Sequence, residues 1–363
     1  MNTLQKYLFR EWLGSFLAIS IVMLFVVIST YAGDLFSDVA RGTIPASLLG
    51  KQLVLRIPDA LQLILPLSLF IAVMFSLGRL YRDQEMAVMY ACGFRWHEML
   101  RPLVFLTLPL AAILLLVGFL LAPGSQVASD KMLDEAFRQS AIWGLRAGDF
   151  QTLQNGQMVI YAETISEAGD ELGNVFIHMH KQAGNTASRA QTWTARTGRY
   201  RFDEASGNRY IRLSGGQVTE QDERTGEYKR IHFETGDLRL PDQEELQQPV
   251  STGKLSTSEL LASATNQDYA ELHWRISPAV AIILLSLLAL PLAHSSPRDG
   301  RYGRLIMGLL VYVVYLNLLT LGRVWTGNGL LPVWLGMWWV HASLLLLVIA
   351  WTFSHLRRLG RLR

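Results

Sequence analysis

Long apolar stretches that lack Asp, Glu, Lys and Arg alternate with polar segments along this chain of 363 residues. A helix needs about 20 apolar residues to cross the hydrocarbon core of a bilayer, and six stretches reach or approach that length. They are Trp12–Gly33, Ala60–Gly78, Pro102–Ser129, Ile276–Pro297, Leu305–Gly322 and Val324–Leu356. The pattern predicts six membrane-spanning helices, near residues 12–33, 53–79, 101–122, 272–293, 303–322 and 333–354.

The polar middle of the chain follows a different pattern. Short segments rich in β-branched and aromatic residues alternate there with clusters of Gly, Asn and Asp, which is typical of antiparallel hairpins. The expected strands are Met158–Glu163, Val175–His180, Thr192–Tyr200, Tyr210–Leu213 and Arg230–Phe233. Several short strands without a long helix between them favour a sandwich, a jelly roll or a partly open barrel. After them, Lys254–Thr265 has the pattern of a short helix or linker.

The two patterns divide the chain into three parts. Residues 1–122 are expected to hold the first three spans, residues 123–271 a jelly-roll-like β domain, and residues 272–363 the last three spans with a basic carboxyl end. The predicted fold class is a polytopic α-helical membrane protein with an inserted all-β domain.

The distribution of basic residues predicts the orientation in the membrane. Half of the residues are hydrophobic and 17% are charged, against about a quarter in soluble domains. Lys and Arg gather before the first span, between spans two and three, between spans four and five, and after the sixth. The positive-inside rule therefore places both termini in the cytoplasm and the β domain on the opposite side.

The charge balance differs in sign between the two regions. Residues 125–270 hold 15 Lys and Arg against 21 Asp and Glu, a net charge of −6, whereas the rest of the chain holds 18 against 9, a net charge of +9. An acidic outer domain gives no reason to expect a nucleic-acid partner.

Catalytic and metal-binding motifs are weak in this sequence. No G-x-S-x-G nucleophile and no G-x-x-x-x-G-K-[ST] phosphate loop occurs. Leu213–Gln217 spells the signature of ABC ATPases, but it follows an expected strand and precedes a polar, turn-rich segment, so we interpret it as a coincidence. His178 and His180 share one strand face without further ligands nearby, which is weak support for a metal site. We expect no catalytic residue, metal or bound cofactor in this chain.

The segment between the second and third spans is more informative. Residues 82–93 predict a short helix that ends at a glycine and places on one face Glu85, Val88, Met89 and Cys92. One interpretation is a loop helix that lies on the membrane. The other is a coupling helix, in which this apolar knob, its carboxylate and the neighbouring Met86 enter a groove on a soluble partner.

Two blocks of residues resemble one family. The run Gln62–Phe70, followed by Leu77–Tyr81, Glu85 and Met89–Gly93, resembles the second span and coupling helix of the lipopolysaccharide-export permeases LptF and LptG. A second block is similar to that family's re-entry into the membrane and fourth span, and comprises Ala270–Ile276, Pro291, Leu292 and Pro297–Arg301. The resemblance covers the whole chain in architecture. The chain resembles the LptF branch more than the LptG branch, because of the Leu63–Leu69 run and the Ala-Cys-Gly sequence that ends the first block.

The resemblance implies a set of partners. It predicts one half of a heterodimeric ABC exporter in the inner membrane of a Gram-negative envelope, paired with the paralogous permease LptG. A cytoplasmic ATPase dimer, LptB, would hydrolyse ATP, and a periplasmic bridge of LptC and LptA would receive lipopolysaccharide. The chain itself would be a non-catalytic subunit, with its β domain in the periplasm.

The resemblance also points to residues that would meet the lipid. Family members carry basic residues at the outer end of the first span, where this chain departs from the pattern with Tyr31, Gly33 and Asp34. The nearest basic residues could instead be ordinary interfacial anchors. The expected substrate-contact residues are Tyr31, Arg41, Lys51, Arg56, Leu65 and Phe70.

Two other classes of function stay open from the sequence. A mechanotransmission subunit would pass ATP-driven motion to its outer domain without moving lipid, and would need no lateral gate between the first and fifth spans. A structural anchor of the envelope would need no coupling helix at all.

Overall fold

A computed structural model describes residues 2–40, 44–139, 147–153, 158–166, 171–183, 187–202, 209–222, 228–239, 252–294 and 303–360. The chain divides into two compact units, which we describe separately. The membrane unit comprises Met1–Tyr31, Leu53–Ala128 and Thr252–Arg363. The second unit comprises Ala32–Gln52 and Ser129–Ser251.

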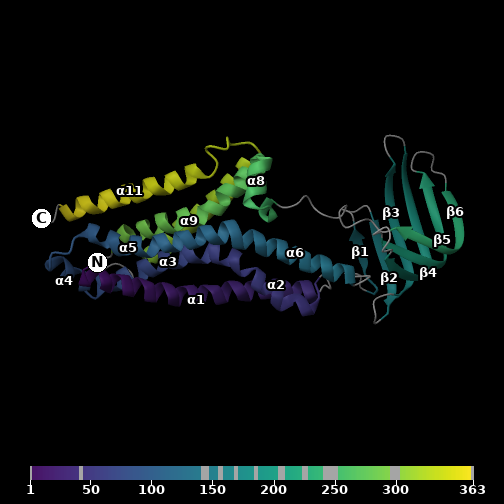
Figure 1. The fold of residues 1–363 in the computed structure, drawn as a ribbon, viewed down its shortest axis with the longest axis horizontal. Helices are drawn as coiled ribbons and strands as arrows, with labels where there is room; N and C mark the ends of the chain where they lie inside the picture. The colour runs from purple at the N-terminus through teal and green to yellow at the C-terminus, as the bar shows by residue number, and fades with distance from the viewer. Residues whose placement is uncertain are drawn as a thin grey trace. The chain divides into compact units, whose positions relative to one another are not determined.

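The membrane unit is built from long apolar helices (Figure 1). Among the described residues, five helices are long and apolar enough to cross a bilayer: Thr3–Ala40, Ile57–Arg82, Trp96–Leu133, Asn266–Leu292 and Gly303–Gly327. We refer to the first, second, fourth and fifth as α1, α3, α9 and α10. The predicted sixth span, 333–354, overlaps with α11, Trp338–Gly360, whose apolar part, Trp338–Ser354, is shorter than these five. The several predicted spans are thus confirmed, while the count of six stays a prediction.

The third long helix continues beyond its predicted end near residue 122. It consists of η2 (Trp96–Met99), α5 (Leu100–Leu116), a π-helical turn η3 (Val117–Leu121) and α6 (Ala122–Gln139). Pro123 does not stop it, because a local π-helical turn and a neighbouring hydroxyl satisfy the backbone groups around the proline. Pro123 has no N–H to offer the carbonyl of Phe119 four residues earlier, and the hydroxyl of Thr257 donates to that carbonyl at 3.4 Å instead.

Helix α9 is the centre of the membrane unit. It packs against α3, α5, α10 and α11, and most of its side chains from Ala270 to Leu292 are buried. Gly308 of α10 allows a close approach to α3, since an added Cβ would lie 2.9 Å from the ring of Phe70 and 2.7 Å from the sulfur of Met74. Small residues at helix contacts permit such packing in membranes.

A buried hydrogen-bond chain joins α9, α10 and α11. The hydroxyl of Ser277 donates to the carbonyl of His273 at 2.7 Å, so towards His341 Nε2, at 3.2 Å, it acts as an acceptor. Nδ1 of His341 then accepts from the hydroxyl of Tyr315 at 2.9 Å. This assignment makes His341 a neutral ring with both nitrogens satisfied, as a low-dielectric interior requires.

Two short helices precede α9 in the sequence. The predicted helix at Lys254–Thr265 is present as η6 (Thr252–Lys254) and α8 (Thr257–Ser263). Ser256 caps α8, and Thr265 caps α9, each through a reciprocal bond with the carboxylate three residues on.

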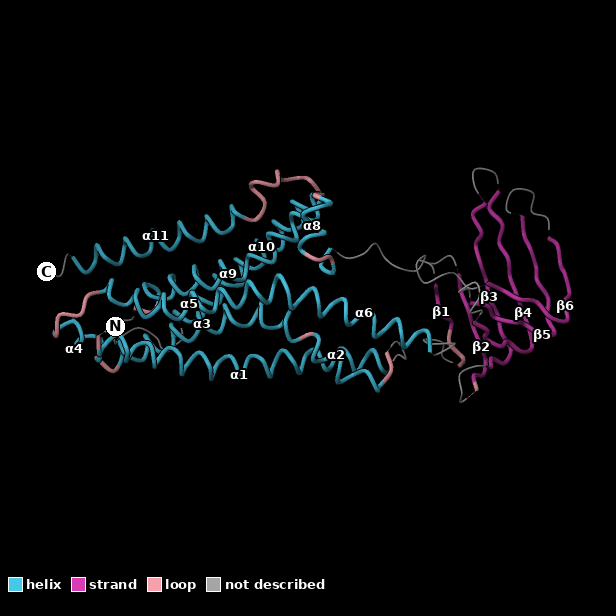
Figure 2. The backbone as a smooth tube through the Cα atoms, viewed as in Figure 1, coloured by secondary structure: helices cyan, strands magenta, loops and turns pink. Residues whose placement is uncertain are grey.

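The β domain is a single antiparallel sheet with strands in sequential order (Figure 2). The strands are β1 (Phe150–Leu153), β2 (Met158–Ile165), β3 (Glu171–Ala183), β4 (Ala187–Phe202), β5 (Arg209–Asp222) and β6 (Tyr228–Arg239). All five predicted strands are confirmed, and β1 was missed. The inserted all-β domain is therefore confirmed. The described strands follow a meander, and the Greek-key connection of a jelly roll is not among them.

One row of residues interrupts the pairing across five neighbouring strands. In each pair of neighbouring strands, residues are paired on both sides of the row, but the two residues that belong to the row are not paired with each other. Asn174 and Gly215 have positive φ angles of 47° and 63° in this row. We call it the bend row, and its members are Glu163, Asn174, Arg196, Gly215 and Glu234.

The bend row reverses the alternation of buried positions. In β3 the buried residues Leu172 and Val175 are three positions apart, and in β4 Ala195 and Gly198 are likewise three apart. A regular strand would separate residues of one face by an even number. The extra residue in each strand therefore keeps the apolar side chains of both halves on the same face.

Candidate functional site

The segment predicted to be a coupling helix forms a short helix, α4 (Glu85–Ala91). Gln84, which precedes it, has a φ of 62°, and Gly93, which follows it, has a φ of 86°. Left-handed residues at both ends set α4 off from α3 and η2, and a glycine accommodates this conformation without strain. The helix lies within the predicted 82–93 but is shorter, because Arg82 still belongs to α3 and turns occupy 83–84 and 92–93.

The predicted coupling residues divide between two faces of α4. Met86 and Met89 are 0% and 5% exposed and belong to the core of the membrane unit, whereas Val88 is 62% exposed and Cys92 is also exposed. The prediction that Glu85, Val88, Met89 and Cys92 share one face is therefore wrong, because Met89 points inward while Val88 and Cys92 are exposed. Residues three apart share a helix face, so the two methionines point inward together. The outward face comprises Ala87, Val88, Ala91 and Cys92, with Glu85 at its edge.

The carboxylate of Glu85 is held by the first long helix. Tyr7 of α1 donates its phenol hydrogen to Oε2 of Glu85 at 2.7 Å. One turn further along α1, Glu11 pairs with Arg79 of α3 at 2.7 Å. Sequence reasoning missed Tyr7, Glu11 and Arg79, because each contact joins residues more than sixty positions apart and no local pattern marks it.

A second polar contact holds α4 to α3. The phenols of Tyr81 and Tyr90 are 3.0 Å apart. Burial raises the pKa of Tyr90, so this phenol keeps its hydrogen across the physiological range. Helix α4 is therefore fixed to the membrane unit by two methionines, a tyrosine pair and the bond from Tyr7.

The residues predicted to contact lipid are only partly brought together. Arg56 lies over the ring of Tyr31, with its guanidinium carbon 5.6 Å from the ring centre, and this distance suits a cation–π contact. Lys51 is exposed on α2 (Leu49–Leu55), and Leu65 is half-buried in α3. Arg41 lies outside the described residues.

Phe70 does not fit its predicted role as a lipid contact. It is 0% exposed and packs at the close approach between α3 and α10. Its position within an apolar run could not distinguish a lipid-facing residue from a core residue, because both are apolar.

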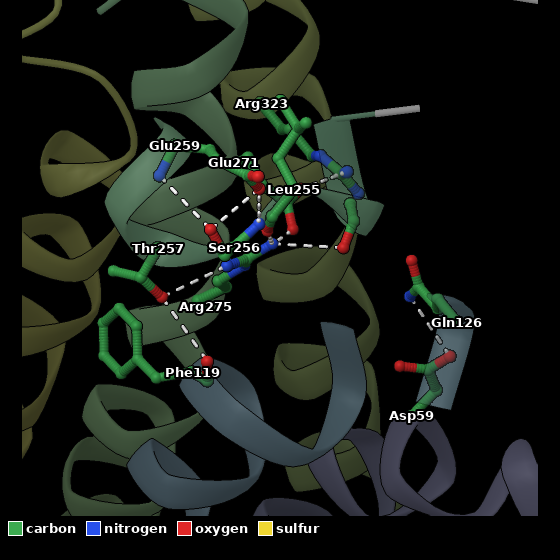
Figure 3. Close-up of polar contacts among 11 residues, drawn as sticks. Asp59, Phe119, Gln126, Leu255, Ser256, Thr257, Glu259, Glu271, Arg275 and Arg323 are labelled. Carbon is green, nitrogen blue, oxygen red and sulfur yellow. Dashed lines mark hydrogen bonds and ion pairs between the residues drawn. The ribbon is translucent and has the colours of Figure 1, made fainter. Parts of the chain in front are cut away.

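A buried ion-pair network lies where the chain re-enters the membrane unit (Figure 3). Glu271 and Arg275, 5% and 2% exposed, pair along α9 at 3.1 Å. The second carboxylate oxygen of Glu271 accepts from Arg323 of α10 at 2.6 Å. Arg323 in turn lies over the ring of Trp274 at 4.8 Å. One carboxylate thus joins two helices through two guanidinium groups.

The remaining hydrogens of Arg275 hold the segment that precedes α8. Its guanidinium donates to the carbonyls of Gly253 at 3.1 Å and Leu255 at 2.8 Å, and to the hydroxyl of Thr257 at 3.4 Å (Figure 3). Because Thr257 also donates to Phe119, the network reaches η3. Gly118 allows η3 to approach α9 closely, since an added Cβ would lie 2.8 Å from the backbone oxygen of Arg275.

The two faces of the β sheet differ in chemistry. One carries a buried apolar cluster that includes Ile160, Ile177 and Leu213. Beside the bend row, the other carries an open groove of about 810 Å³. A cross-strand row lines this groove and consists of Tyr161, Phe176, Thr194, Gln217 and His232.

The signature-like pentapeptide Leu213–Gln217 lies inside β5. An ATPase signature would open a helix towards phosphate, whereas these residues pair with β4 and β6 on both sides of the bend row. The interpretation as a coincidence agrees with this placement.

The family of the chain follows from comparison with known proteins. A sequence profile described as "Lipopolysaccharide export system permease LptF/LptG" matches residues 6–355. The chain belongs to this family.

Curated relatives agree with the family assignment. The lipopolysaccharide export system permease protein LptF of Escherichia coli K12 is 28% identical over 357 residues, which cover 98% of this chain and 96% of that protein. LptF of Shigella flexneri matches with the same identity and coverage. LptG of Escherichia coli K12 is 23% identical over 177 residues, or 46% of this chain and 47% of that protein. The predicted greater similarity to LptF is confirmed.

Membership of the LptF/LptG family confirms the predicted class of protein. The chain is a multi-pass inner-membrane permease of lipopolysaccharide export. A permease subunit needs a connection to an energy source and a route for its substrate, and the two polar sites described above are candidates for parts of that machinery.

Proposed function

We propose that this chain is the LptF-type half of an ABC exporter, pairs with an LptG-type permease, and takes lipopolysaccharide from the inner membrane to a periplasmic bridge. The observation that carries the proposal is the arrangement of α4. Its inner face is anchored by Met86 and Met89, while Val88, Cys92 and the edge carboxylate of Glu85 remain towards the outside. Such a helix can receive force from a soluble partner without separating from the membrane unit.

The proposed energy source is a separate LptB-type ATPase dimer in the cytoplasm. ATP would be bound there, and this chain would bind no cofactor. Glu85 uses one carboxylate oxygen for Tyr7, and its second oxygen would accept from a cation on the ATPase. A charge-assisted bond of this kind is worth about 1.5–3 kcal/mol, enough to change occupancy of the complex tenfold or more.

The orientation is part of the proposal. The basic segments Lys6–Arg10 and Arg79–Arg101 would lie in the cytoplasm with both termini, and the β domain in the periplasm, where LptC- and LptA-type proteins would form the bridge. The apolar face of the sheet supports a role with acyl chains, because exposing them to water costs about 0.8 kcal/mol per methylene. Tyr31, Arg41, Lys51, Arg56 and Leu65 remain proposed lipid contacts.

Glu85 provides the test. In a strain depleted of its own permease, the wild-type gene should restore growth, Glu85→Ala should weaken both growth and recovery of the ATPase, and Glu85→Arg should do worse because like charges would oppose each other. Asp83→Ala is the matched control, since Asp83 is an exposed carboxylate two residues away. Full growth with Glu85→Arg would refute the coupling role.

A further inference from the structure

Side-chain contacts of described residues connect α1 to the rest of the membrane unit near its amino end, and they include the bond from Gln5 to the carbonyl of Glu98 at 3.5 Å. Tyr7 donates to Glu85 of α4, Glu11 pairs with Arg79 of α3, and the hydroxyls of Ser15 and Ser76 are 2.7 Å apart. The apolar contacts lie in the same part of the helix, where Leu8, Trp12 and Phe16 are buried. Among these polar contacts of the described residues, the one made by Tyr7 leads to α4.

The middle of α1 has few contacts within this chain. In the most apolar window of α1, 6% of the residues are buried, against 67% in α3 and in α9. Several large side chains in the middle of α1 are exposed, among them Ile21 at 68% and Phe25 at 73%. Since few packed side chains would have to separate, α1 can tilt or rotate at lower cost than α3 or α9.

The three elements meet at one polar junction. Arg79 interacts electrostatically with Glu11, with Tyr7 and with Glu85, so the guanidinium of α3 lies among the groups of α1 and α4. We call Tyr7, Glu11, Arg79 and Glu85 the α1 junction. A displacement of Glu85 would change the contacts of Tyr7 directly, and those of Glu11 only through Arg79.

We propose that Tyr7 is the positioning residue that transmits displacement of α4 to α1. The inference rests on the proposed function, because it takes Glu85 as the residue that receives force from the ATPase. It adds the route: the carboxylate passes motion through its hydrogen bond to the phenol of α1, the least buried of the five long helices. The anchored methionines hold α4 to the core, while Tyr7 links its exposed edge to the helix that can move.

Removal of a single oxygen tests the route. Tyr7→Phe keeps the ring and deletes the donor, so the protein should fold and bind the ATPase as the wild type does. In the full exporter reconstituted in lipid, ATP hydrolysis should stay within about twofold, while lipid released per ATP should fall about three- to tenfold, as expected for loss of a bond to a charged group at a partly exposed site. Ser15→Ala is the matched control, because it removes an α1 contact of equal length that does not involve α4.

A distance measurement tests the motion itself. With Cys92 replaced by Ser, spin labels at Phe25→Cys and Phe75→Cys, both exposed in the described structure, report the separation of α1 from α3. The separation should change on ATP addition in the otherwise wild-type exporter and in Ser15→Ala. It should stay constant in Tyr7→Phe.

The outcomes separate this inference from the proposed function. If Glu85→Ala transports lipid as well as the wild type does, the proposed coupling is refuted. If Glu85→Ala impairs transport but Tyr7→Phe transports as the wild type, or loses ATPase binding, the inference about Tyr7 alone is overturned. The double variant of Tyr7→Phe and Glu85→Ala should transport as Glu85→Ala does. The effects of the two substitutions are not additive, because both remove the same hydrogen bond.

Discussion

Glu271 and Arg275 lie one turn apart on α9, and their charged groups meet at 3.1 Å with almost no exposure to solvent. Removal of one member of such a pair leaves a buried charge without its partner, which costs far more than the pair contributes. The pair also orients the guanidinium towards the carbonyls of Gly253 and Leu255.

Arg275→Gln is expected to destabilise the membrane unit by about 3–5 kcal/mol. The measurement is the thermal unfolding of the purified complex in detergent. Arg275→Lys should recover part of the loss, because one ammonium cannot reproduce the forked contacts. Arg212→Gln, in an exposed pair of the sheet, should leave the midpoint almost unchanged; equal midpoints for the two glutamine variants would contradict the assignment.

Gly308 should not tolerate a branched side chain. Gly308→Val is expected to cost about 1–3 kcal/mol through overpacking against Phe70 and Met74, with lower yield of folded complex. Gly308→Ala should be milder, because the sulfur of Met74 can move. Gly303→Val on the same helix is the control, since an added Cβ there meets nothing within 4 Å. A normal yield for Gly308→Val would show that α10 can separate from α3 without cost.

The Arg212 and Asp237 pair makes the sheet sensitive to acid. Hydrogen bonds from Arg212 lower the pKa of Asp237 below its ordinary value. A carboxyl with a lowered folded pKa stabilises the fold above its ordinary pKa of about 3.9, and this stabilisation is lost as the pH falls through the lowered value. Asp237→Asn should therefore lower the denaturant midpoint of β-strand loss at pH 7 only slightly, because the pair is exposed. At pH 3 its midpoint should be closer to that of the wild type, and a difference that grows on acidification would contradict the sign.

The orientation can be checked with thiol labelling in intact cells. Tyr228 is 69% exposed and Cys92 is the single native cysteine. A membrane-impermeant maleimide should label Tyr228→Cys in a Cys92→Ser background once the outer membrane is opened. Native Cys92 should react only after the inner membrane is permeabilised. The reverse result would invert the proposed topology.

Sequence patterns predicted the long helices and the β insert, because both rest on local periodicity. They predicted only Tyr210–Leu213 of β5 and Arg230–Phe233 of β6, since the alternation of buried residues changes phase at the bend row. The third helix runs past its predicted end near residue 122, and the π-helical turn and Thr257 accommodate Pro123 within it.

The candidate site was predictable only in part. The short helix and its carboxylate were visible because glycine and periodicity are local signals. The inward direction of Met86 and Met89 was not, since an apolar residue on a loop helix fits a partner's groove and the chain's own core equally well. The i, i+4 spacing of Glu271 and Arg275 did carry a signal. An acid and a base at that spacing, at the start of an apolar run, could have been recognised as a buried pair.

The bend row also restricts which insertions and deletions the sheet can accept during evolution. One residue in each of five adjacent strands occupies it, and residues at equal distance from the row are paired across neighbouring strands. Deletion of Arg196 alone would shift one half of β4 by one position and turn either Trp193 or Gly198 to the opposite face, against neighbours that had not shifted. Lineages of this protein should therefore vary freely in the lengths of their hairpin connections, while the number of residues between the row and each buried position stays constant in all five strands at once.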